Sequence, residues 1–196
     1  MPAQPAVWPV TRLDELGSAD AVEALAPCCA SRRWASAVVA GRPYGTLDRL
    51  IAGSAAALAT LDWPDIAEAL AAHPRIGGQP APAVPVGPAA PPGRPAQARE
   101  PSVGQARPGQ EAAWSAQEQR AATGLDAAGR DELRAANVAY EERFGHVFLI
   151  RATGRSAAQM LDALRQRLGH EAGAEREVVR AELREIVALR LAKAFR

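Results

Sequence analysis

This 196-residue chain has few residues of several types, and each scarcity argues against a class of protein. Its two cysteines, Cys28 and Cys29, are adjacent, so a disulfide between them would be strained. Two thiols also fall short of the four ligands of a structural zinc site, and we expect both to be reduced and partly buried. Lysine is limited to Lys193, and the formal net charge is only +1. No excess of charge therefore indicates nucleic acid or an anionic membrane as a partner.

Long apolar runs are also missing. No segment approaches the roughly 20 apolar residues that span a bilayer. Residues 1–10 lack the basic region followed by an apolar one that is typical of a secretory leader. We therefore expect a cytoplasmic protein without membrane contact. The chain has no glycine-rich loop between a strand and a helix, which argues against a nucleotide cofactor.

Helical periodicity is what the sequence has in abundance. Apolar residues recur three and four positions apart, small polar residues suited to N-caps precede these segments, and glycine or proline follows them. The expected N-caps are Ser18, Ser31, Thr46, Asp62, Asp126 and Ser156. Residues 147–150 could be a strand, but no second strand-like segment exists to pair with them, so we expect a buried extended connector. The prediction is an all-α domain of seven or eight helices covering residues 1–196.

A proline-rich segment interrupts this pattern at about residues 78–110. Nine of the sixteen prolines lie between Pro80 and Pro108, with almost no large apolar side chain among them. Such a segment buries too little apolar surface to offset the entropy of ordering it, so we expect a flexible, polyproline-like insertion. A proline ligand for a signalling domain is an alternative interpretation of the same composition.

His73 stands out because Pro74 follows it, within the segment Ala-His-Pro-Arg-Ile-Gly at residues 72–77. The residue before a proline is disfavoured in the helical region, so the preceding helix has to end near Ala72. The other two histidines, His146 and His170, follow glycines expected to end helices, and we expect His170 to be solvated at the surface. A histidine satisfied within the core is the usual outcome, so His73 alone does not establish a site.

A second group of polar residues lies beyond the insertion, on a helix predicted at about residues 111–123. Ser115, Glu118 and Gln119 stand at positions i, i+3 and i+4, so they project from one helix face. They could form a solvated face. If they meet His73, a histidine and a glutamate within hydrogen-bond reach would suit general acid–base chemistry near neutral pH. A zinc site is less attractive because no third ligand has a clear spacing.

The helix after Asp126 carries one polar residue inside its apolar stripe. The stripe comprises Leu133, Ala136, Asn137, Tyr140 and Phe144, and Gly145 follows it as a C-cap. Because a buried amide needs partners, Asn137 is predicted to hydrogen-bond a buried group.

Several motifs together resemble one enzyme family. They are Cys28-Cys29-Ala30-Ser31 with Trp34, Arg42-Pro43, His73-Pro74-Arg75-Ile76-Gly77, Ser115-x-x-Glu118-Gln119, Asn137-x-x-Tyr140-Glu141-x-x-Phe144-Gly145 and Phe148-Leu149-Ile150-Arg151-Ala152. In combination they resemble the 2-oxo-4-hydroxy-4-carboxy-5-ureidoimidazoline (OHCU) decarboxylases, from about residue 11 to 192 apart from the insertion. The resemblance implies an all-helical enzyme that acts late in urate breakdown, yields S-allantoin, and uses no metal or organic cofactor.

The same resemblance assigns roles to residues. His73 resembles the family's catalytic histidine and Glu118 its catalytic glutamate. The residues that resemble its groups binding the small ureidoimidazoline substrate are Pro74, Ser115, Gln119, Leu149, Ile150, Arg151 and Ala152. We expect His73 and Glu118 to govern the hydroxyl and carboxylate end and the delivery of a proton. Ser115, Gln119 and backbone groups of Ile150 and Arg151 would hold the ring and the ureido amides.

Other interpretations stay open at this point. The chain could be a non-catalytic helical module that recruits a partner through the proline-rich insertion, or a decarboxylase acting on a related ureido acid. The last helix, from about Ala174 to Ala194, has enough apolar surface for the core or for a dimer interface, so a homodimer is possible.

Overall fold

The computed structural model of the chain describes residues 7–76 and 124–196. These residues contain eight α-helices and no strand, which confirms the all-α prediction. The helices are α1 (Val10–Glu15), α2 (Ser18–Leu25), α3 (Arg32–Ala40), α4 (Leu47–Ala59), α5 (Trp63–Ala71), α7 (Ala127–Phe144), α8 (Ala157–Leu168) and α9 (Ala172–Ala194). The proline-rich insertion and the helix expected at 111–123 lie outside the described residues.

Local sequence signals set most of the helix starts. Five of the six predicted N-caps accept a hydrogen bond from a backbone N–H in the first turn; they are Ser31, Thr46, Asp62, Asp126 and Ser156. The prediction for Ser18 is wrong, because Gly17 has the extended backbone of the cap position and Ser18 is already helical. Such a cap typically contributes about 1 kcal/mol.

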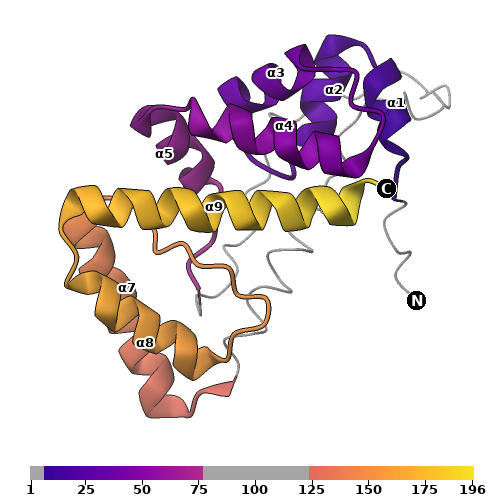
Figure 1. Ribbon diagram of the computed structural model, residues 1–196. Coiled ribbons are helices and arrows are strands. Elements are labelled where there is room, and N and C mark those ends of the chain that lie inside the picture. The colour runs from indigo at the N-terminus through magenta and orange to yellow at the C-terminus, as the bar shows by residue number, and fades with distance from the viewer. Residues whose placement is uncertain (1–6, 77–123) are drawn as a thin grey trace, which may run out of the picture.

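Helix α9 runs through the centre of the fold. Figure 1 shows α1–α5 on one side of it and α7 with α8 on the other. It packs along α4, and its last turn is followed by Phe195, which pairs with Trp8 near the start of the described chain. The Trp8 N–H donates to the Ala194 carbonyl at 2.8 Å, and the Arg196 N–H donates to the Trp8 carbonyl at 2.8 Å. The two ends of the described chain are therefore joined.

The buried apolar residues form two clusters. The first cluster gathers side chains of α1–α5 and α9, with Trp34 completely buried within it. The second cluster lies between α7 and α8, around Leu133, Tyr140 and Met160, and includes Ile76 from the segment after α5. Ile76 thus brings the end of the first half of the chain against the second half.

The predicted extended connector is confirmed at residues 147–150, which adopt no helix or strand. Its side chains are shared between the clusters, because Leu149 packs in the first cluster whereas Phe148 and Ile150 pack in the second. This alternation is typical of an extended chain. Gly145, which precedes the connector, ends α7 with φ of +74°, a left-handed conformation that glycine adopts readily.

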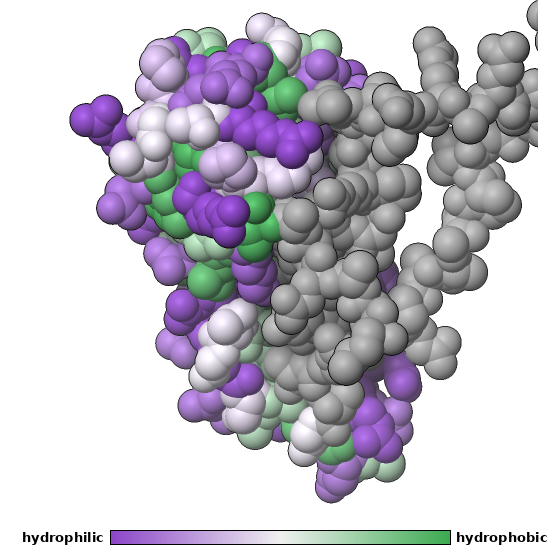
Figure 2. Space-filling view, turned by 90° about the vertical axis from the view of Figure 1, so that its right-hand side faces the viewer, coloured by the Kyte–Doolittle hydropathy of each residue, from purple (hydrophilic) through white to green (hydrophobic). Residues whose placement is uncertain are grey.

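The surface carries little exposed apolar area among the described residues, where the exposed large apolar side chains are Val7 and Val138. On the described part of the face in Figure 2, small green apolar patches alternate with purple hydrophilic ones. None of the described helices has both the length and the apolar character to cross a membrane.

Candidate active site

The end of α5 fixes His73 in one orientation. The helix ends at Ala71, as predicted near Ala72, and the His73 N–H closes the last turn by donating to the Leu70 carbonyl at 2.9 Å. The imidazole folds back so that Nδ1 lies 2.9 Å from the Ala69 carbonyl. A carbonyl only accepts, so Nδ1 carries the hydrogen and Nε2 of the neutral ring keeps its lone pair.

The Nε2 atom of His73 is buried, and none of the described residues hydrogen-bonds it. Burial lowers the pKa of His73 to about 4, and the positive charge of Arg190 adds to this lowering, whereas the Ala69 carbonyl acts in the opposite direction. His73 is therefore a neutral imidazole at pH 7, with a hydrogen-bond acceptor ready for a proton.

Arg190, on α9, was not predicted from the sequence. It is only 1% exposed, and its Nη1 donates to the Pro27 carbonyl at 3.4 Å. A signal for it existed, because Leu183, Val187 and Arg190 are spaced four and three apart on one helix face. A charged residue inside an apolar stripe is as unusual as the amide of Asn137. The same search for polar residues within apolar helix stripes would therefore have found Arg190.

Helix α7 holds the segment that follows His73. The Asn137 side-chain amide donates to the Ile76 carbonyl at 3.1 Å and to the Leu133 carbonyl at 2.8 Å, which confirms the predicted buried hydrogen bond. One turn later, Glu141 accepts from Arg75 at both carboxylate oxygens, at 2.6 and 2.5 Å. Two contacts from α7 therefore fix the backbone just beyond His73 and Pro74.

The connector also receives charged partners. The Leu149 carbonyl accepts from Arg167 Nη1 at 2.8 Å, and the Arg151 N–H donates to Glu182 Oε2 at 2.7 Å. The N–H of Arg151, which we expected to face a ligand, is thus already engaged. The physical reason is that the connector has no neighbouring strand, so side chains must satisfy its backbone.

A buried ionic network lies behind the connector. The Arg167 guanidinium donates to Glu175 Oε1 from Nε at 2.8 Å and from Nη2 at 2.5 Å. The Tyr140 hydroxyl donates to the same carboxylate oxygen. Burial raises the pKa of Glu175, but hydrogen bonds from Arg167 and Tyr140 more than offset this and hold it below its ordinary value. The network ties α7, α8 and α9 together at one point.

The expectation that His170 is solvated at the surface is wrong. Its side chain is 29% exposed, and Nδ1 lies 2.8 Å from Glu175 Oε2, so the ring completes the carboxylate's set of donors. His146 contacts aromatic rings instead, with its ring centroid 5.1 Å from that of Trp63 and 5.5 Å from that of Tyr140. Both histidines therefore have structural environments distinct from that of His73.

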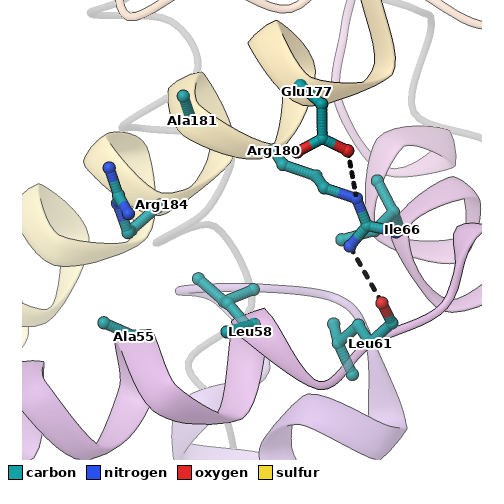
Figure 3. Close-up of a pocket in the computed structure, with 9 residues that line it drawn as sticks. Ala55, Leu58, Leu61, Ile66, Glu177, Arg180, Ala181 and Arg184 are labelled. Atoms are coloured by element: carbon teal, nitrogen blue, oxygen red, sulfur yellow. Dashed lines mark hydrogen bonds and ion pairs between the residues drawn. The ribbon is translucent and has the colours of Figure 1, made fainter. Parts of the chain in front are cut away.

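A pocket of about 450 Å³ opens between α4, α5 and α9 (Figure 3). Leu58, Leu61 and Ile66 supply apolar side chains, and Glu177, Arg180, Ala181 and Arg184 line it from α9. Arg180 Nη1 donates to the Leu61 carbonyl at 2.8 Å. None of the residues that line this pocket is a predicted site residue, so it is separate from the site around His73.

The second half of the predicted site lies outside the described residues. Ser115, Glu118 and Gln119 belong to the undescribed range 77–123, so their pairing with His73 stays a prediction. Within residues 7–76 and 124–196, no three side chains of His, Cys, Asp or Glu gather as a metal-binding group. Cys28 and Cys29 are both fully buried rather than partly buried.

The sequence profile of the OHCU decarboxylase family matches residues 14–90 and 95–192. The chain belongs to the OHCU decarboxylase family. The match spans α2 to α8 entirely and most of α9, so the family resemblance covers both hydrophobic clusters and the His73 segment. Against a solved OHCU decarboxylase, crystallised in the presence of (S)-allantoin, the chain is 26% identical with a TM-score of 0.64. This likeness covers 87% of the chain and 96% of that structure.

Two further proteins are similar to this family member. The uric acid degradation bifunctional protein TTL of Arabidopsis thaliana is 28% identical over 169 residues, which is 86% of this chain. The chain spans only 45% of the length of that relative. A solved (S)-allantoin synthase is 18% identical with a TM-score of 0.63, and the match covers 95% of the chain and 54% of that structure. At this identity the likeness shows the fold alone.

Proposed function

We propose that this chain decarboxylates OHCU to S-allantoin in urate breakdown, without a metal or organic cofactor. The observation that carries the proposal is membership of the OHCU decarboxylase family across nearly the whole chain. The geometry of His73 supports it, because a buried neutral imidazole with one free lone pair suits proton transfer from a bound substrate.

The chemistry needs little beyond positioning and one controlled proton transfer. The bond between the ring carbon and the carboxylate breaks and releases CO2. Its electron pair forms a double bond to the carbon that carries the ureido group, and the C=N pair moves onto the ring nitrogen, which takes a proton from solvent. The hydroxyl on the same carbon loses its proton as a carbonyl forms. A proton is then added to one face of the carbon that carries the ureido group, and that face determines the handedness of the product.

In this reaction Nε2 of His73 accepts the proton of the substrate hydroxyl. The hydrogen bond from Nδ1 to the Ala69 carbonyl holds the ring in the required tautomer. Glu118 pairs with His73 and shares the proton that is returned to the ring carbon. Arg190 is close enough to His73 for its charge to lower the pKa of the imidazole, and it provides positive charge for an anionic substrate.

Binding is assigned to two groups of residues. Pro74 contributes to the wall next to His73, while Ser115 and Gln119 hold the ring and ureido amides. Leu149 and Ile150 of the connector, together with Arg151 and Ala152 that follow it, bind along the opposite edge of the substrate. Since the Arg151 N–H and the Leu149 carbonyl are engaged by side chains, the backbone of Ile150 is the part of the connector that supplies hydrogen bonds to the substrate.

The test is to add the protein to freshly generated OHCU and to follow circular dichroism as chiral allantoin appears. We expect acceleration over the spontaneous reaction and S-allantoin as the product. Equal rates with and without protein, or racemic allantoin, would reject the function. Turnover of a related ureido acid but not of OHCU would show that the enzyme acts on a different substrate.

We further propose that the enzyme is cytoplasmic and forms a homodimer, and that residues 1–196 form one catalytic domain with a proline-rich insertion at about 78–110. The dimer would use a surface other than the apolar stripe of α9, because that stripe packs in the first cluster. Sedimentation equilibrium measures it directly, and a monomer at micromolar concentration would contradict it.

A further inference from the structure

The connector is held at two backbone groups on either side of Ile150. Arg167 donates to the Leu149 carbonyl at 2.8 Å, and Glu182 accepts from the Arg151 N–H at 2.7 Å. Both partners belong to the α8 and α9 side of the molecule. A buried backbone outside a sheet needs such partners, and here ionised side chains supply them.

The spacing of these contacts determines where the Ile150 backbone points. In an extended chain, the N–H and C=O groups of one residue face the side opposite to those of its neighbours. Because Leu149 and Arg151 direct their bonded groups toward α8 and α9, the N–H and C=O of Ile150 face away from these helices. Among the described residues, no hydrogen bond to either Ile150 group is found.

Helix α9 supports both of these backbone contacts from one face. Glu175 holds Arg167, which in turn holds the Leu149 carbonyl, and Glu182 holds Arg151 directly. The two glutamates are seven residues apart, which places them on the same side of a helix two turns apart. The helix therefore fixes both the position of the connector and its rotation about its own axis.

We propose that Glu182 is a positioning residue for substrate binding. By holding the Arg151 N–H, it sets the rotation of the connector at which the Ile150 N–H and C=O face the substrate. Glu182 does not itself touch the substrate. This inference rests on the proposed function, because it requires the substrate to bind along the connector.

A purely structural role for Glu182 is the competing explanation. Its Oε1 also accepts from Arg155 Nη2 at 3.1 Å, and the two side chains are 14% and 33% exposed. Removal of Glu182 therefore abolishes a salt bridge as well as the contact with Arg151. The chain offers a matched control, because Arg155→Met removes the salt bridge and leaves the contact between Glu182 and the Arg151 N–H.

The test compares steady-state kinetics of Glu182→Leu, Glu182→Gln and Arg155→Met on freshly generated OHCU. We expect Glu182→Leu to raise KM by about three- to tenfold with kcat within about twofold, the change expected when one hydrogen bond to substrate is weakened equally in the ground and transition states. Glu182→Gln retains a carbonyl oxygen that accepts from Arg151, so its KM stays near that of the wild type. Arg155→Met also keeps a normal KM.

A second variant covers the case in which Glu182→Leu does not fold. Glu182→Asp keeps the charge but withdraws the carboxylate by one methylene, and it is expected to raise KM in the same way. Amide hydrogen exchange at Arg151 gives a readout that is independent of activity, and it should be faster in Glu182→Leu or Glu182→Asp but not in Arg155→Met.

The possible outcomes separate the two proposals. An active wild-type enzyme in which Glu182→Leu and Arg155→Met shift KM equally, or in which neither Glu182→Leu nor Glu182→Asp shifts it, overturns the positioning role alone. An inactive wild-type protein overturns the proposed function, and the positioning role with it.

Discussion

The two hydrophobic clusters bury polar groups of different kinds. In the first cluster the polar groups around Trp34 are neutral hydroxyls, since Ser31 accepts from its backbone N–H at 3.3 Å and Ser54 accepts from its indole Nε1 at 3.2 Å. Beside the second cluster, Arg167 and Glu175 are both ionised and are 5% and 0% exposed. Around Trp34, the first region is thus held by apolar packing with neutral hydrogen bonds, whereas the second region is also held by a buried ion pair.

This difference suits the neutral state of His73. Among the described residues, the charge that acts on the imidazole is that of Arg190, which lowers its pKa. The buried carboxylate of Glu175 belongs to the other cluster, where Arg167, Tyr140 and His170 satisfy it. Among the described residues, the charges are therefore arranged so that His73 stays neutral while the connector is held firmly.

The largest expected effect is on turnover, when His73 is replaced. His73→Ala should slow decarboxylation of OHCU by about 10²–10⁴-fold, the usual contribution of a positioned acid–base group. The free energy of unfolding should also fall, because alanine removes a buried ring whose Nδ1 donates to the Ala69 carbonyl, so the rate is compared per folded molecule. Initial rates by circular dichroism and urea denaturation measure the two quantities.

His146→Ala is the matched control for this comparison. Its ring contacts Trp63 and Tyr140, so we expect a loss of stability with turnover per folded molecule preserved. A His73→Ala enzyme that retains more than about a tenth of the wild-type rate would contradict the assignment of His73.

The next largest effect is on stability, in the second region. Glu175→Ala leaves the buried guanidinium of Arg167 without its carboxylate, and removal of one partner of such a pair costs about 3–5 kcal/mol. Ser54→Ala is the counterpart in the first region, where the loss of a neutral acceptor for Trp34 should cost about 1–3 kcal/mol. Urea denaturation of both variants tests the comparison, and equal losses would remove the distinction between the two regions.

The pH dependence of the free energy of unfolding tests whether His73 is neutral in the folded protein. The pKa of His73 is about 4 in the folded protein, against an ordinary value of 6.5 for the unfolded chain. Between these values the unfolded state binds a proton that the folded state does not. The contribution of His73 to the free energy of unfolding is therefore fully present above pH 6.5 and declines as the pH falls toward 4, by at most about 1.4 kcal/mol per pH unit.

The measurement is urea denaturation of the wild type and of His73→Gln from pH 4 to 7.5. The difference between the two proteins isolates the histidine, and it should change with pH only below about 6.5. The kcat/KM of the wild type should likewise show no fall near pH 6.5, because the base remains neutral there. A difference that does not vary with pH would show that His73 is not desolvated in the folded protein.

Sequence patterns predicted the local features of this fold, because those features depend on neighbouring residues. The N-caps at Asp62 and Ser156 and the buried amide of Asn137 follow from spacings of three and four. Ser18 was misplaced by one residue because serine and glycine both suit an N-cap, and local sequence does not decide between Ser18 and Gly17.

The features that were missed depend on contacts between distant segments. Tyr140 and Glu175 are 35 residues apart, and only the packing of α7 against α8 and α9 brings them together around Arg167. His170 looked solvated because a glycine precedes it, yet the start of α9 places Glu175 next to its ring. Of the candidate site, the sequence indicated His73 and the connector and carried an unused signal for Arg190, whereas Glu182 required the three-dimensional structure.

The smallest expected effect concerns the contact between the two halves of the chain near His73. Arg75 is bidentate to Glu141, but its side chain is 56% exposed, so solvent screens the pair. Arg75→Ala should lower the free energy of unfolding by less than about 1 kcal/mol, whereas Asn137→Ala, which removes the buried donor to the Ile76 carbonyl, should cost about 1–3 kcal/mol. Urea denaturation of both variants measures the difference. An Arg75→Ala loss as large as that of Asn137→Ala would show that the charged contact, and not the buried amide, holds the segment after His73 against α7.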